Sequence, residues 1–389
     1  MRLRDHPYRF GLLLLAALGL LALDLCQRGA TPLPPQPRAV LGKEHPPALP
    51  LQLRAQGHIP MPPDAAAAHA SALLPMPEDS PAVLTAFWFA GDRESAPNVQ
   101  IAAAQFNRAS QRWSAPRYLV NRHAVGKELG FGLRRLGNPV AWIDAHKRIH
   151  LFVVATGLGG WSAGRILHLR QKGGSQALDA LEFESLGVLP LSWLWNTSFL
   201  VRTAPLPLED GGMLLPAYFE LGIKYPVALR FDREGRYVTM QRISRRGHLL
   251  QPALLPISPT HWLALMRNKA SEFRVAVAQT EDSGESWNDL PNLALHNPDS
   301  SIAALNLNAG QSLLVLNNTP DGRHLLDLYQ SANGLDWQLA HPLRHGTPGQ
   351  EFSYPAIAWA NGSVWISYTD QRQRIAWLRF GPEDGSKSR

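Results

Sequence analysis

The chain has 389 residues, of which 45% are hydrophobic, and a formal net charge of +7 at pH 7. This length and hydrophobic content suffice for one large or two ordinary domains with a packed core. The positive charge could meet nucleic acid, anionic lipid or an acidic glycan. No nucleic-acid-binding motif and no basic stripe interleaved with aromatic residues occurs, so nucleic acid is not an expected partner and an acidic glycan is preferred.

The amino terminus has the layout of a secretory signal or a short membrane anchor. Arg2, Arg4 and Arg9 come before an apolar run of 14 residues from Phe10 to Leu23. A membrane span normally needs about 20 apolar residues, and no clean small-x-small cleavage site follows. We therefore expect residues 1–26 to act as a signal peptide or an N-terminal membrane anchor. The bulk of the chain is then exported to the periplasmic or cell-surface side.

Residues 27–63 are rich in proline and are predicted to form a semi-rigid, extended linker. Cys26 is the single cysteine, so no disulfide can form within the chain. The His, Cys and carboxylate residues lack the clustered spacing of a metal site, so neither a metal nor another cofactor is expected. Residues 383–389 are predicted to be a polar tail.

The main part of the chain is predicted to be all-β. The 31 Gly and 32 Pro are evenly scattered, and few windows have a 3.6-residue apolar period. The expected strands lie within residues 83–89, 99–104, 136–143, 149–155, 193–203, 211–218, 263–274, 275–279, 312–318, 325–329, 356–359, 363–368 and 375–380.

One hairpin pattern repeats along this region. After the alternating strand at residues 275–279, Asp282 to Gly284 supplies a turn, and Trp287 follows as an aromatic anchor. The closing aromatic residues of the copies, Trp113, Tyr237, Trp287 and Trp337, are separated by 124, 50 and 50 residues. Residues 167–183, with a Gly-Gly pair, are interpreted as a copy that lost its aromatic residue.

Periods of about 40 to 50 residues with several strands each are typical of propeller blades. Residues 64–382 are therefore predicted to form a six-bladed β-propeller. We also expect the strand near Ala376 to pair with an early strand of the chain, in the first sheet, because that closes the ring and removes an exposed edge.

Several short motifs together resemble the sialidase (neuraminidase) superfamily, in particular its bacterial Asp-box or BNR-repeat propeller proteins. The likeness covers roughly residues 66–380. The motifs, in chain order, are His69-Ala-Ser71, Trp88-Phe-Ala-Gly-x-x-Glu94, Asn138-Pro139, Leu215-Pro-Ala-Tyr218, Gln251-Pro-Ala253, the 280–287 hairpin, Phe352-Ser-Tyr-Pro-Ala356, Tyr368-Thr and Arg374-Ile.

The resemblance implies a catalytic scheme and a set of roles. Sialidases hold the sugar carboxylate with three arginines, attack with a Tyr whose proton a Glu accepts, and protonate the leaving group with an Asp. By position, Tyr354 resembles the nucleophile, and Arg267 and Arg323 resemble two of the arginines. This sequence departs from the pattern at His58-Ile-Pro60, where the first arginine belongs, and at Gln251, where the Glu is expected.

The catalytic candidates are Tyr354 and the carboxylates Glu94, Asp92 and Glu220. The candidates for substrate binding are Arg267, Arg323, Arg93, His69, Asn138, Tyr218, Gln251, Asn317 and Tyr368. The expected function is that of an exported, sialidase-like glycoside hydrolase acting on an acidic or related sugar of a glycan or surface polysaccharide. The alternatives are a non-catalytic glycan-binding propeller involved in polysaccharide assembly and a purely structural or protein-binding propeller.

Overall fold

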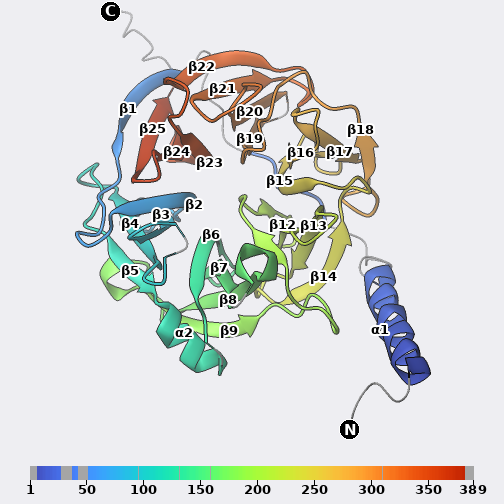
Figure 1. Cartoon of the computed structure of the whole chain (residues 1–389). Helices are drawn as coiled ribbons and strands as arrows, with labels where there is room; N and C mark the ends of the chain where they lie inside the picture. Colours follow the sequence, from blue (N-terminus) through green and yellow to red (C-terminus); the bar gives the residue numbers. More distant parts are fainter. Residues whose placement is uncertain are drawn as a thin grey trace, which may run out of the picture.

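A computed structural model describes residues 7–27, 37–42 and 51–381, except residues 95, 131, 158 and 309. The described chain forms a ring of six antiparallel sheets around a central axis, as Figure 1 shows. This confirms the prediction of an all-β, six-bladed propeller. The expected polar tail, residues 383–389, lies outside the described residues.

The blades are numbered here in chain order, and each has four strands from the axis outward, with a fifth, short strand in blade 3. Blade 1 holds β2 (Ala67–Pro75), β3 (Ala82–Gly91), β4 (Gln100–Asn107) and β5 (Arg117–Val120). Blade 2 holds β6 (Arg135–Ile143), β7 (Ile149–Thr156), β8 (Arg165–Lys172) and β9 (Glu182–Val188). Blade 3 holds β10 (Phe199–Val201), β12 (Met213–Phe219), β13 (Tyr225–Phe231) and β14 (Tyr237–Arg242), with the short β11 (Leu206–Pro207) beside β12.

The second half of the chain continues the same order. Blade 4 holds β15 (Leu249–Pro256), β16 (Trp262–Asn268), β17 (Ala276–Thr280) and β18 (Asn288–Leu290). Blade 5 holds β19 (Ala303–Asn308), β20 (Gln311–Leu316), β21 (Leu325–Ser331) and β22 (Gln338–His345). Blade 6 holds β23 (Phe352–Ala360), β24 (Ser363–Asp370) and β25 (Arg374–Gly381).

The outermost strand of blade 6 comes from the other end of the described chain. β1 (Gln52–His58) pairs antiparallel with β25, and His58 lies opposite Ala376. The expected pairing of the Ala376 region with an early strand is thus confirmed, although it completes the last sheet and not the first. β1 also lies within the predicted linker 27–63, so the propeller begins before residue 64.

The repeated hairpins join the third strand of a blade to the fourth. In the β17–β18 hairpin, Thr280 Oγ1 accepts a hydrogen bond from Gly284 N at 2.8 Å, and Asp282 Oδ1 accepts one from Ser286 N at 2.9 Å. Gly284 has a φ of 87°, which favours glycine. The copies that end at Trp113, Tyr237 and Trp337 occupy the same place in blades 1, 3 and 5, and the copy without an aromatic residue does so in blade 2.

Among the described residues, two α-helices lie outside the sheets. α2 (Arg122–Leu129) joins blade 1 to blade 2 and is capped by Asn121, whose side chain accepts from His123 N at 2.8 Å. α1 (Pro7–Gln27) lies beside the ring (Figure 1). Among the described residues, no helix combines the length and the apolar character needed to cross a membrane. The described chain also contains the 3₁₀ turns η2 (Gly160–Ala163) and η3 (Leu178–Ala180).

Part of the predicted linker packs against the propeller. Ala39 is buried, forms a β-bridge with Leu208 of blade 3, and donates from its backbone N to Pro259 O of blade 4 at 2.8 Å. Its methyl group joins a buried cluster that includes Leu254 and Trp262. The segment 37–42 is therefore held by the fold, unlike a free spacer.

Candidate functional site

Four of the inner strands carry the same irregularity near their first residues. Ala70, Asn138, Gln251 and Tyr354 have φ values of 54°, 43°, 47° and 53°, and the strand register shifts at each of them. A bulge of this kind re-aims a side chain, and left-handed backbone at a residue other than glycine is strained. All four bulges lie on one face of the ring, where the loops between second and third strands also emerge. This upper face holds the candidate site.

Tyr354 and Gln251 meet through Arg267, at the end of β16. Arg267 Nη1 lies 3.5 Å from Tyr354 Oη and 3.2 Å from Gln251 Oε1. Gln251 Nε2 lies 3.4 Å from Tyr218 Oη, which extends the chain of polar contacts to blade 3. The fold therefore brings four of the candidate residues together: Tyr354, Arg267, Gln251 and Tyr218. Burial raises the pKa of Tyr218, so its hydroxyl stays neutral.

Arg267 is held in place by Asp299. The distance from Arg267 Nε to Asp299 Oδ1 is 2.6 Å, and Lys269 Nζ lies 3.7 Å from the other carboxylate oxygen. Burial alone would lower the pKa of Arg267, but electrostatic interaction with the Tyr354 hydroxyl and with Asp299, together with the hydrogen bond to Asp299, raises it overall. Arg267 is therefore a fixed cation at the hydroxyl of Tyr354.

Arg323 and Arg372 share one carboxylate beside this pair. Arg323 Nη1 lies 3.0 Å from Glu351 Oε1, and Arg372 Nε lies 2.7 Å from Glu351 Oε2. The Arg323 guanidinium carbon is 5.8 Å from the centre of the Tyr354 ring. Burial by itself would raise the pKa of Glu351, but hydrogen bonds from Arg372 and Ser353 and both arginine charges lower it to about 2. The carboxylate thus stays ionised and orients two cations.

Sequence reasoning placed Arg323 here but missed Arg372 and Glu351. Arg372 lies in the loop between β24 and β25, which corresponds in blade 6 to the β20–β21 loop of Arg323. It adds a third guanidinium to this face of the ring. His58, which stands where the family pattern has its first arginine, instead bonds Asp370 through Nε2 at 2.9 Å.

His69 of β2 lies against Tyr354. The two ring centroids are 4.2 Å apart, and neither ring nitrogen of the buried His69 has a hydrogen-bond partner among the described residues. Burial and then the positive charge of Arg372 lower the pKa of His69 well below its ordinary value of 6.5. The neutral ring keeps one donor and one acceptor available beside the phenol.

Arg202 reaches the site from below. It follows β10 and donates to three main-chain carbonyls: Ser71 O at 3.1 Å, Tyr354 O at 2.6 Å and Pro355 O at 2.9 Å. Burial lowers its pKa to about 10, so it remains charged at neutral pH. Sequence reasoning did not find this residue. Its guanidinium ties blade 3 to blades 1 and 6 directly beneath Tyr354.

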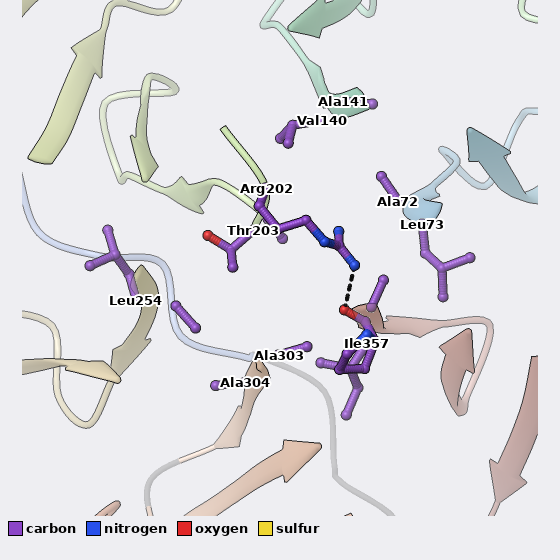
Figure 2. Close-up of a pocket in the computed structure, with 14 residues that line it drawn as sticks. Ala72, Leu73, Val140, Ala141, Arg202, Thr203, Leu254, Ala303, Ala304 and Ile357 are labelled. Carbon is purple, nitrogen blue, oxygen red and sulfur yellow. Dashed lines mark hydrogen bonds between the residues drawn. The ribbon is translucent and has the colours of Figure 1, made fainter. Parts of the chain in front are cut away.

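Figure 2 shows Arg202 crossing a small central cavity toward the segment that contains Ile357. The cavity is lined mainly by alanines, and Arg202 is the one charged residue among those that line it. It therefore lies under the polar cluster and is separate from it. We assign the candidate site to the upper face, where the titratable groups gather.

The predicted carboxyl catalysts differ in their surroundings. Glu94, between β3 and β4, is ion-paired with Arg372, and its side chain is 27% exposed. Asp92 and Arg93 are exposed, and neither contacts the Tyr354 cluster through a hydrogen bond or ion pair among the described residues. Glu220 follows β12 and pairs with Lys224 at 3.3 Å. Glu94 is thus the candidate that the fold joins to the arginines.

Two predicted binding residues, Asn317 and Tyr368, support the framework. The amide of Asn317 donates to Leu325 O at 2.7 Å and Phe352 O at 2.8 Å, so its donors are used by the backbone. Tyr368 is buried and packs edge-on against Phe352, and burial raises its pKa to about 12. Asn138 occupies the bulge of β6 without a hydrogen bond to the cluster among the described residues. The part of the chain that the structure describes holds no group of three His, Cys, Asp or Glu side chains that could bind a metal ion.

The arrangement of strained inner strands, a phenol and three arginines on one face of a six-bladed ring defines a sialidase-like propeller. The family of BNR repeat-like domains matches residues 82–366, and the chain belongs to that family. No curated protein matches the sequence.

Solved structures share the fold at low sequence identity. A Hadza microbial sialidase superposes with a TM-score of 0.64 at 15% identity, covering 81% of this chain and 66% of that one. Trypanosoma rangeli sialidase gives 0.63 at 12% identity, covering 81% and 55%. A protein of unknown function from Dyadobacter fermentans gives 0.64 at 12%, covering 86% and 99%. The match thus spans about two thirds or less of each sialidase, and at these identities it shows the fold alone.

Proposed function

We propose that the protein is a sialidase-like glycoside hydrolase that acts on an acidic sugar of a glycan. The observation that carries this proposal is the 3.5 Å approach of Arg267 Nη1 to Tyr354 Oη. Arg323 and Arg372 lie beside this pair and share Glu351. The solved structures of Trypanosoma rangeli sialidase include a complex with sialic acid, which supports a sugar acid as the substrate class.

The three arginines would bind the sugar carboxylate. A guanidinium offers five N–H donors, and Arg267 and Arg323 each use part of theirs on protein acceptors. The remaining donors can engage a carboxylate in two-point fashion. The carboxylates Asp299 and Glu351 keep the guanidinium groups in fixed orientations, which lowers the entropy cost of binding.

Tyr354 would act as the nucleophile. Its Oη forms a bond to the anomeric carbon while the glycosidic C–O bond breaks, and the departing oxygen takes a proton from Glu94. Water then cleaves the sugar–tyrosine bond, with Glu94 accepting the water proton and Tyr354 Oη, the leaving group of this step, taking a proton back from solvent. Arg267 would stabilise negative charge on the phenol oxygen. Because Gln251 cannot accept the phenol proton, that proton must pass to solvent, and we expect slow turnover.

A second candidate is a non-catalytic glycan-binding propeller involved in polysaccharide assembly. It is favoured by Gln251 in the place of a base and by the pairing of Asp299, Glu351 and Glu94 with arginines. Such a site could hold a sugar acid through Arg267 and Arg323 without carrying out hydrolysis.

A substrate screen with two variants separates the candidates. Purified full-chain protein is assayed with fluorogenic glycosides of sialic acid and related sugar acids, and binding of the free acids is measured by calorimetry. As a hydrolase, the wild type should turn over at least one glycoside, Tyr354→Phe should lose at least 100-fold, and Gln251→Glu should gain activity by restoring a base. Binding without turnover in both the wild type and Gln251→Glu would select the second candidate.

We also propose that the protein is exported and acts on the periplasmic or cell-surface side, with its N-terminal segment at the membrane. The apolar run in α1 supports this placement. Cell fractionation combined with protease treatment tests this placement. Protease is added to intact cells, to cells with an opened outer envelope and to fully lysed cells. If the propeller is cleaved only after full lysis, it lies in the cytoplasm and the proposal is wrong.

A further inference from the structure

A group of exposed apolar side chains lies on the upper edge of blade 3. We call it the apolar rim and define it by five residues in two loops. Their exposed fractions are Trp193 61%, Leu194 40%, Trp195 44%, Leu221 43% and Ile223 66%. Exposed apolar residues are ordinary when scattered singly, but a group of them marks an interaction surface.

The two loops are neighbours in space. Residues 189–198 lead into β10, residues 220–224 follow β12, and Phe199 pairs with Phe219 across these strands. Beyond that pair, Glu220 N donates to Ser198 O at 2.8 Å. The loops therefore leave the sheet at the same point and present their apolar side chains together.

The N-terminal helix is attached to the same rim. Ser192 Oγ donates to Asp24 Oδ1 of α1 at 2.7 Å, and Asp24 is 1% exposed. The rest of α1 extends from this contact with a bare apolar surface. Seven of its leucines, between Leu12 and Leu23, are about half exposed or more.

Water is an unfavourable surrounding for this helix. Burying an exposed leucine side chain is favourable, so seven exposed leucines on one helix strongly favour an apolar phase. The acyl layer of a membrane can cover the helix from all sides. Tryptophan residues next to such a helix are typical of the boundary between lipid and water.

We propose that the apolar rim and α1 together form a lipid-contact surface, whose partner is a bilayer containing anionic lipid. Trp193, Trp195 and Ile223 enter the headgroup region beside the helix. The exposed Arg245 lies in the next loop, which contacts the rim through the bond from His248 N to Ile223 O at 2.8 Å. Its cation adds attraction to anionic headgroups. The apolar rim is thus a second lipid contact beside α1, and it does not require the helix to cross the membrane.

The proposal fixes how the propeller faces the membrane. The 220–224 loop joins the second and third strands of blade 3, as the loop of Arg323 does in blade 5 and that of Arg372 in blade 6. These loops emerge on one face of the ring. The candidate site therefore opens on the face that carries the lipid contact.

Tryptophan quenching tests the contact directly. Full-chain protein is bound to vesicles of phosphatidylcholine and phosphatidylglycerol, with or without brominated acyl chains. Brominated lipid should quench part of the wild-type tryptophan fluorescence, and Trp193→Phe/Trp195→Phe should lose most of that quenchable part while staying vesicle-bound. Trp337→Phe, in the β21–β22 turn on the opposite face, should retain it. Equal quenching in wild type and the double variant would overturn the proposal.

A second measurement separates lipid from protein as the partner. Trp193→Ser/Ile223→Ser should weaken vesicle binding about tenfold, whereas Leu335→Ser/Leu339→Ser, which alters exposed leucines at the β21–β22 turn, should not. Light scattering of the same proteins in detergent reports the oligomeric state. If the rim variant lowers the oligomer mass and leaves vesicle affinity unchanged, the rim binds a second copy of the chain and the lipid proposal is wrong.

Discussion

The guanidinium of Arg202 donates a 2.6 Å hydrogen bond to the main-chain carbonyl of Tyr354, although 152 residues separate them in the chain. The guanidinium carbon also lies 5.2 Å from the centre of the Tyr354 ring. This contact holds the backbone of Tyr354 where its φ of 53° is strained. A buried cation thus fixes the residue around which the candidate site is built.

The first prediction concerns this contact. Arg202→Met fills a similar volume but leaves three buried carbonyls without a donor. Since an orphaned buried polar group costs roughly 1–3 kcal/mol, we expect a loss of about 3 kcal/mol or more in the free energy of unfolding, measured by urea titration. Arg112→Met, at an exposed arginine, is the control and should change it by less than about 0.5 kcal/mol. A loss below about 1 kcal/mol in Arg202→Met would show that water satisfies the carbonyls.

The second prediction concerns the pH dependence that His69 imposes. Its pKa in the folded protein lies well below 6.5, so the unfolded chain binds a proton first as the pH falls. The neutral His69 ring therefore contributes to the stability of the fold above pH 6.5, and this stability is lost as the pH falls below that value. In His69→Phe, the slope of unfolding free energy between about pH 6 and 5 should fall by up to ~1.4 kcal/mol per pH unit. The exposed His123→Phe should keep the wild-type slope, and an unchanged slope in His69→Phe would mean that His69 is protonated in the fold.

The third prediction concerns Glu351, whose pKa is lowered from an ordinary 4.5 to about 2. A carboxyl group whose pKa is lower in the folded protein stabilises the fold at pH values above its pKa in the unfolded chain. This stabilisation is lost as the pH falls from about 4.5 to about 2. Glu351→Gln should therefore cost on the order of 3 kcal/mol at pH 7, and the difference from wild type should shrink across that acid range. Denaturant titrations at several pH values measure it. For Glu285→Gln, at an exposed site, the unfolding free energy should follow the pH dependence of the wild type. If Glu351→Gln is less stable than the wild type by the same amount at every pH, the ion pairs are not the cause of its lower stability.

The fourth prediction compares two glycines in corresponding hairpins. Gly235 and Gly173 have φ values of 80° and 69°, so alanine is strained at both. A Cβ at Gly235 would also collide with the buried ring of His150, whereas one at Gly173 meets nothing within 4 Å. We expect Gly173→Ala to cost about 1 kcal/mol and Gly235→Ala about 1–3 kcal/mol more, as thermal unfolding would report. Equal losses would show that the His150 ring moves aside freely.

The repeated hairpins could be predicted because their signals are local. A turn with Asp282 and Gly284 and an anchor at Trp287 lie within a few residues, so the sequence displays them directly. The two 50-residue separations then predict the blades. Proline follows the residue with positive φ in three of the four bulges, at Asn138-Pro139, Gln251-Pro252 and Tyr354-Pro355, but the sequence alone did not predict the bulges.

The candidate site could be predicted only in part. Six residues taken from the family resemblance lie together in the fold, because the segments that contain them follow one another in the order of the blades. These residues are Tyr354, Arg267, Arg323, Gln251, Tyr218 and His69. Arg372, Glu351 and Arg202 were missed, since each is a single charged residue without a motif. Asn317 and Tyr368 were expected to bind substrate, but the fold uses them to support its backbone and core.

The amino-acid sequence by itself determined the five repeated hairpins and the all-β class, since strand alternation, turns and aromatic anchors act over a few residues. Tertiary structure alone decided which charges meet. Glu94 reaches Arg372 across 278 residues, and β1 closes the ring against β25 from the far end of the chain. Such pairings follow from ring closure, which sets the loops of all six blades around one axis, and no local pattern encodes the resulting distances.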